Sequence, residues 1–190
     1  MYNNCMEKEV KTMIEDINGF RLPRYTQIPD VGLYLEQVVR YVNAHLALLG
    51  EPELTSSMVS NYVKQGLIPS PIKKAYTAEH LARLLFIAVV KPVVPLEGLR
   101  LMFGIQEDNY PLQTAYDYFC DEFENMLGAA FGISPARDRI GKTQSDAKDL
   151  LRNTILATVN KVYLDRYLED YQKQRKNEMH SEKRESAQDI

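Results

Sequence analysis

The sequence predicts an all-α protein with one short extended segment between two of its helices. Apolar residues recur at helical spacing along most of the chain, which is the main sequence signal of amphipathic helices. Glycine and proline gather near the ends of these stretches, where helices stop. Only residues 72–76 lie between prolines and a new helix without that spacing. We therefore expect no strand outside this segment.

The charge pattern favours a binding surface for a polyanion. The 190 residues carry a net charge of −3, and 45% of them are hydrophobic, an ordinary globular balance. Residues 61–100, however, contain six basic and two acidic side chains, whereas residues 101–136 contain six acidic and no basic ones. This asymmetry predicts one face that attracts nucleic acid and another that avoids it.

Membrane insertion and secretion are not expected. The N-terminus lacks the apolar core of a signal peptide. The longest apolar run, residues 81–96, contains Arg83 and Lys91, which interrupt a membrane span. Two distant cysteines, Cys5 and Cys120, do not make a disulfide framework. A reducing cytoplasm is therefore the predicted location.

The first part of the chain is predicted to hold two helices and a connector. Residues 1–19 are expected to form an N-terminal helix that ends at an Asn-Gly pair. Two prolines make residues 20–29 an extended connector. Asp30 is the predicted N-cap of a helix over residues 33–49, whose apolar side chains form one stripe.

A short helix and the extended segment follow. Thr55 is a favoured N-cap residue, and residues 56–65 are expected to form a helix that Gly66 closes. Two prolines then force the chain out of the helix, because proline lacks an N–H donor and has a fixed torsion. We expect residues 72–76 to form an extended wing.

A buried helix and a small one complete this part. Residues 78–91 follow the N-cap Thr77 and are apolar almost all round, which predicts burial on more than one side. A small helix over residues 96–103 is expected to end at Gly104. The polar segment 106–111 is the predicted domain boundary.

The C-terminal part is predicted to be helical as well. Residues 112–128 are amphipathic, and we interpret the acidic run 117–124 as a solvated face. The longest helix is expected over residues 145–174, without a strict heptad repeat, followed by a charged, disordered tail over 176–190. Tyrosine and methionine are common in protein interfaces, so we expect residues 109–175 to form a dimer. The alternative is that the tyrosines of these helices line a ligand pocket.

The short helix after Thr55 has the layout of a DNA-recognition helix. Its apolar residues can pack inward while a polar face stays outward. Asparagine can bond an adenine edge, serine can bond bases or phosphates, and lysine can neutralise a phosphate. The residues predicted to bind DNA are Thr55, Ser56, Ser57, Ser60, Asn61 and Lys64 on the helix, and Lys73, Lys74 and Tyr76 on the wing.

The run Ser57–Thr77 resembles the start of MerR-type winged helix-turn-helix domains. There a recognition helix ends in Gly-Leu-Ile and Pro, a basic wing with a tyrosine follows, and a helix rich in leucine and isoleucine comes next. The matching residues here are Val59, Tyr62, Gly66, Leu67, Ile68, Pro69, Tyr76, Leu81, Leu84 and Ile87. Together with residues 22–39, the stretch also looks like an uncharacterised bacterial family of unknown function thought to carry such a domain, over roughly residues 20–130.

This resemblance implies a transcriptional regulator that binds double-stranded DNA as a homodimer reading two half-sites. The winged helix-turn-helix would span residues 20–108. Residues 109–175 would dimerise, and sensing a small-molecule effector is a second role open to them. No cofactor, metal or membrane is implied.

A protein-interaction adaptor with the same shape but without DNA is the alternative hypothesis. MerR proteins carry an arginine and a second aromatic residue where this chain has Ser60 and Asn61, and the net charge is acidic. No catalytic set or metal-ligand spacing stands out, so we do not expect an enzyme. Residues 140–143 end like a phosphate-binding loop but lack its first glycine, so nucleotide binding is not expected.

Overall fold

The computed structural model describes residues 17–50, 53–135 and 145–188, and over these residues the protein is all-helical, as predicted. Most of the expected N-terminal helix lies outside the described residues. The elements are η1 (Tyr25–Gln27), α2 (Leu35–Leu46), η2 (Ala47–Leu49), α3 (Ser56–Lys64), α4 (Ala78–Val90), α5 (Leu96–Asn109), α6 (Leu112–Ala130) and α7 (Asp146–Gln188).

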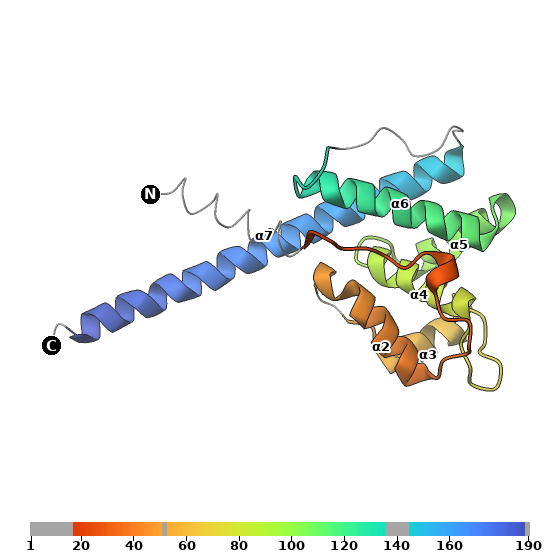
Figure 1. The fold of residues 1–190 in the computed structure, drawn as a ribbon, viewed down its shortest axis with the longest axis horizontal. Coiled ribbons are helices and arrows are strands. Elements are labelled where there is room, and N and C mark those ends of the chain that lie inside the picture. The colour runs from red at the N-terminus through yellow and green to blue at the C-terminus, as the bar shows by residue number, and fades with distance from the viewer. Residues whose placement is uncertain (1–16, 51–52, 136–144, 189–190) are drawn as a thin grey trace.

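The helices are arranged around α4. Helices α6 and α7 pack along each other on one side, α2 and α3 lie on the opposite side, and α7 leaves the body as a long arm (Figure 1). Helix α2 contacts both α3 and α4, while α4 also contacts α6 and α7. None of the described helices is long and apolar enough to cross a membrane.

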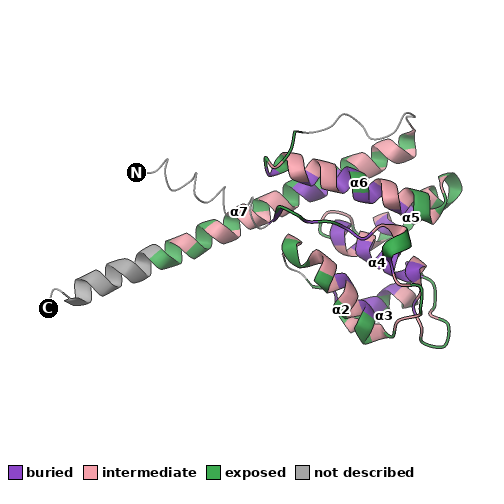
Figure 2. Ribbon diagram, viewed as in Figure 1, coloured by how far each residue is buried: buried purple, intermediate pink, exposed green. Residues whose placement is uncertain are grey.

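Helix α4 supplies the centre of the core, which confirms the prediction that it is buried on more than one side. Figure 2 shows buried residues along α4. Leu81, Leu84, Leu85 and Ile87 have no exposed surface. Burying one such side chain contributes about 1.5–3 kcal/mol. The buried cluster around α4 includes side chains from both sides of the expected domain boundary, from α2 and α3 to α6 and α7.

Helix α3 begins and ends where the sequence predicts. The Thr55 hydroxyl accepts a hydrogen bond from the Met58 N–H at 3.2 Å. At the other end, Gly66 adopts a left-handed conformation (φ +70°), and the Leu67 N–H reaches back to the Tyr62 carbonyl at 2.9 Å. This pattern is a Schellman motif, which satisfies the last carbonyls of a helix.

The segment expected to form a wing is a tight turn and not a pair of strands. Two isolated antiparallel bridges, Leu33 with Tyr76 and Ile72 with Ala75, replace the expected hairpin, and no strand occurs in the described part of the chain. Each arm is too short for a ladder, and the prolines before it remove N–H donors. A wing needs strands, so this part of the fold prediction was wrong.

Helix α5 is longer than predicted. It passes through Gly104 and ends at Asn109, so the expected boundary segment begins inside a helix. Gly104 lacks the positive φ of a helix-ending glycine. Proline at 111 ends the helix instead, because its ring pushes Tyr110 into the extended region (φ −145°, ψ 143°).

Two other helix boundaries differ from the prediction. Helix α7 begins after Ser145, as expected, but continues to Gln188 through the segment expected to be disordered. That segment lacks glycine and proline and is rich in strong helix formers. Helix α2 begins at Leu35, and Asp30 does not cap it: the Asp30 carboxylate lies 3.4 Å from the Ala78 N–H of α4.

The acidic run of α6 is not simply a solvated face, which corrects the sequence interpretation. Three of its four carboxylates hold the connector that precedes α2, and the fourth, Glu122, is buried and faces α7. Glu124 accepts hydrogen bonds from the Leu22 N–H at 2.9 Å and the Arg24 guanidinium at 2.7 Å. Asp117 accepts one from the Tyr25 N–H at 2.8 Å. The acidic side chains therefore tie residues 22–25 to the helical body.

Candidate nucleic-acid interface

Helix α3 presents one apolar and one polar face, as the sequence predicts. Val59 and Tyr62 are buried in the core, and Met58 and Val63 are half-buried beside them. The predicted contact residues that are exposed on this helix are Ser57, Ser60, Asn61 and Lys64, with Thr55 exposed at its N-cap and Ser56 half-buried.

Local hydrogen bonds hold several of these polar side chains in place. The Ser60 hydroxyl donates to the Ser56 carbonyl at 2.9 Å. The side-chain oxygen of Asn61 accepts a hydrogen bond from the side-chain amide of Gln65 at 3.2 Å. A serine that donates keeps its acceptor lone pairs, and an asparagine that accepts keeps its two N–H donors. The polar face therefore retains hydrogen-bonding capacity for a ligand.

The turn after α3 carries two exposed lysines in an unusual conformation. Lys73 and Lys74 have φ values of 49° and 66°. The Ala75 N–H donates to the Ile72 carbonyl at 2.9 Å across the turn. Positive φ at both central residues is the signature of a type I′ turn, which favours Asn-Gly. The two lysines therefore adopt a backbone conformation that is unfavourable for residues other than glycine.

Tyr76 belongs to the core and not to the surface. Its side chain is only 5% exposed, and its ring meets the His80 ring edge-on, with 5.4 Å between centroids. Its backbone exchanges two hydrogen bonds of 2.8 Å with Leu33. Tyr76 therefore anchors the turn, and the prediction that it contacts DNA does not fit its burial.

Two of the six cations in the basic segment are unavailable to a polyanion. The Arg83 side chain is 9% exposed and bridges Glu79 at 3.2 Å and Glu107 at 2.8 Å. Lys91 is partly buried, with its ammonium 3.8 Å from the Met58 sulfur, and burial lowers the pKa of Lys91. The exposed cations of the segment are Lys64, Lys73, Lys74 and Arg100.

Arg100 is a member of this surface that sequence reasoning did not assign to the site. From α5 it donates a hydrogen bond to the Gln65 carbonyl at 2.7 Å, and it pairs with Glu97 at 2.9 Å. A cation at a helix C-terminus complements the helix dipole. Arg100 thus fixes the end of α3 through a contact between residues 35 positions apart, which no local pattern reveals.

A family model described as a domain of unknown function (DUF1836) matches residues 23–119, about half of the chain. The matched range contains α2 to α5, and with them the polar face of α3 and the two-lysine turn. No curated protein and no solved structure matches the chain.

Proposed function

We propose that this protein, which belongs to the DUF1836 family, is a transcriptional regulator. It would bind double-stranded DNA through α3 and the turn 72–75. The observation that carries the proposal is the pair of exposed lysines at positive φ. Strained backbone persists where function requires it. Two consecutive exposed lysines at the tip of a turn suit adjacent phosphates of a DNA strand.

The polar face of α3 supplies the second half of the proposed interface. Its apolar face is fixed in the core, so the helix is presented rigidly, in the manner of MerR-like recognition helices. Ser57, Ser60 and Asn61 face the base edges in this arrangement, while Lys64 neutralises a phosphate. Lys73 and Lys74 contact the backbone beside the groove. Three carboxylates of α6, those of Asp117, Asp121 and Glu124, are bound to the connector.

The arm of α7 supports a homodimer. Leu164, Leu168 and Tyr171 recur at i, i+4 and i+7 and are 55%, 54% and 51% exposed. This spacing places them on one helix face, and such a stripe pairs with the same stripe of a second copy. A dimer of this kind presents two α3 helices, which supplies the affinity that one short helix lacks.

A salt-dependent binding experiment tests the DNA-binding face. Fluorescence anisotropy would follow a labelled duplex of about 30 base pairs, some three helical turns. If Lys64, Lys73 and Lys74 each contact one phosphate, each contact contributes about −0.9 to the slope of log K against log salt concentration. The Lys64→Ala/Lys73→Ala/Lys74→Ala variant should therefore make this slope shallower by about 2.7.

A charge-matched control separates this face from general electrostatics. Arg21→Ala/Lys173→Ala/Lys176→Ala removes three positive charges from the connector and from positions of α7 outside the stripe of Leu164, Leu168 and Tyr171, and we expect it to bind like the wild type. Equal losses in the two triple variants would show that the assigned face is wrong. Absence of wild-type binding even at low salt would overturn DNA binding and leave the adaptor hypothesis.

A further inference from the structure

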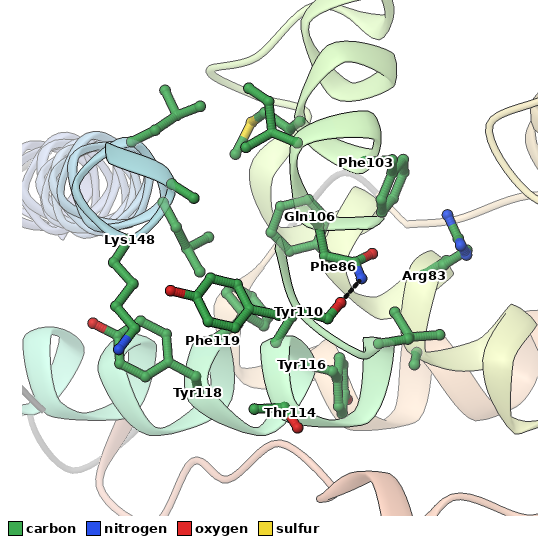
Figure 3. A pocket seen from close by; sticks show the side chains of 18 residues that line it. Arg83, Phe86, Phe103, Gln106, Tyr110, Thr114, Tyr116, Tyr118, Phe119 and Lys148 are labelled. Carbon is green, nitrogen blue, oxygen red and sulfur yellow. Dashed lines mark hydrogen bonds between the residues drawn. The ribbon is translucent and has the colours of Figure 1, made fainter. Parts of the chain in front are cut away.

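A largely apolar pocket lies between α4, α5, α6 and the start of α7 (Figure 3), and none of the residues that line it belongs to α3. Its cavity volume is about 170 Å³. Aromatic side chains from three helices and the α5–α6 junction dominate the lining: Phe86, Phe103, Tyr110, Tyr118 and Phe119. The proposed interface with DNA does not use this pocket.

The size and lining of the pocket define the class of ligand. An apolar protein cavity of about 150 Å³ accommodates benzene, so a cavity of this volume holds one aromatic ring with a small substituent. Aromatic walls offer ring edges and faces for favourable contacts with another ring. Nucleotides and sugars are both too large and too polar for such a lining.

Gln106 supplies a specific polar contact. Its side-chain N–H donates to the Tyr110 carbonyl at 2.7 Å, as the dashed line in Figure 3 shows. Its carbonyl oxygen is shielded from solvent and has no hydrogen-bond partner among the described residues. A buried acceptor without a donor is costly, and in native proteins it calls for an explanation. A ligand with one O–H or N–H group would satisfy this side-chain oxygen once the Gln106 amide turns toward the cavity.

The charged side chains of the lining already have contacts within the protein, so the apolar walls decide which ligand fits. Arg83 is already engaged by Glu79 and Glu107. The Lys148 ammonium lies over the rings of Tyr110 and Tyr118, 5.7 and 5.5 Å from their centroids. An anion entering the pocket would lose its hydration beside the Gln106 carbonyl, which repels it.

We propose that this pocket binds a neutral, single-ring aromatic compound that donates one hydrogen bond to the Gln106 carbonyl oxygen. Binding would also affect α3, a consequence that rests on the proposed DNA-binding function. Helix α5 carries Phe103 and Gln106 at the pocket and Arg100 at the end of α3. One rigid helix therefore contacts both sites, which makes the ligand an effector of DNA binding.

Calorimetric titration with phenol, toluene and benzoate tests the ligand site directly. The wild type is expected to bind phenol saturably and benzoate at least about tenfold more weakly, because a charge must be desolvated. In Gln106→Leu, the ratio of phenol to toluene affinity should fall about three- to tenfold, the worth of one hydrogen bond. Ala115→Leu, which fills part of the pocket, should weaken both ligands by at least about tenfold.

Ala44→Leu on the exposed face of α2 is the matched control and should bind like the wild type, with circular dichroism confirming that all variants fold. Absence of saturable binding, tighter binding of benzoate than of phenol, or an unchanged ratio of phenol to toluene affinity in Gln106→Leu would overturn the proposal.

The effector role is tested by fluorescence anisotropy with labelled DNA. Phenol should change the DNA affinity of the wild type but not of Ala115→Leu, and an unchanged wild-type affinity would overturn that role. If the protein binds no DNA at all, the calorimetric result still decides the ligand site.

Discussion

At the residue scale, the turn at positions 73 and 74 carries two positive charges at the expense of backbone stability. A type I′ turn favours Asn-Gly, and a left-handed conformation costs an ordinary residue roughly 1–2 kcal/mol. Both positions here are lysine. A turn selected for stability alone would carry other residues, so the lysines are the part of the turn that function explains best.

We therefore expect Lys73→Asn/Lys74→Gly to raise the free energy of unfolding by about 1 kcal/mol, because it relieves this strain. The same variant should bind DNA more weakly, since it removes two cations. Urea denaturation measures the first effect and anisotropy the second.

Lys73→Ala/Lys74→Ala is the control for that prediction. It removes the same charges but leaves a side chain at each positive φ, so DNA affinity should fall without the gain in stability. A loss of stability in the Asn-Gly variant would show that the lysine side chains stabilise the turn by contacts of their own.

At the element scale, the connector before α2 depends on ion pairs with α6. Arg24 lies 2.7 Å from both Asp121 and Glu124, and the Glu124 side chain is only 11% exposed. Arg21 also reaches Glu124, but at 3.7 Å and with its own side chain 70% exposed. Glu124 therefore has two partners: Arg24, which is partly buried, and Arg21, which is solvated.

Arg24→Ala should lower the free energy of unfolding by about 1–3 kcal/mol, because it leaves a nearly buried carboxylate without its main partner. Arg21→Ala should change stability by less than about 0.5 kcal/mol, as expected of an exposed charge. Chemical denaturation of both variants checks this difference. Equal effects would mean that the connector is held by its backbone contacts alone.

The helices also show which stop signals act on a helix. Gly66 ends α3, because its left-handed backbone completes a Schellman motif. Gly104 does not end α5, because a glycine can also be helical, at a cost of about 1 kcal/mol relative to alanine. Pro111 excludes the helical conformation at the residue before it and therefore decides the end of α5.

At the scale of the whole molecule, the arm of α7 predicts the oligomeric state. Leu164→Asp/Leu168→Asp places two charges on the exposed stripe and should raise the dimer dissociation constant at least about 100-fold, since unpaired charges would be buried. Sedimentation equilibrium measures it. Val31→Asp, at a side chain that is 83% exposed outside α7, should leave the dimer unchanged. A wild type that stays monomeric at high concentration would contradict the proposed dimer.

Much of the candidate interface could be predicted from sequence, because its signals are local. The apolar residues of α3 fall on one face, and its N-cap and closing glycine lie within one turn of the helix they define. The placement of Tyr76 and Arg100 could not be predicted in this way. Burial of the first depends on α4, and the role of the second depends on a carbonyl at the end of another helix.

The amino-acid sequence by itself determined the all-helical class, the buried character of α4 and both ends of α3, because periodicity, capping and proline geometry act over a few residues. Only the tertiary structure decided which charges are free. It paired Arg83 with two carboxylates, buried much of Lys91, and turned three carboxylates of α6 toward the connector. It also replaced the expected wing with a two-lysine turn and enclosed the pocket beside Gln106. The availability of a charge and the shape of a cavity depend on neighbours that are distant in the chain, and folding alone brings those neighbours together.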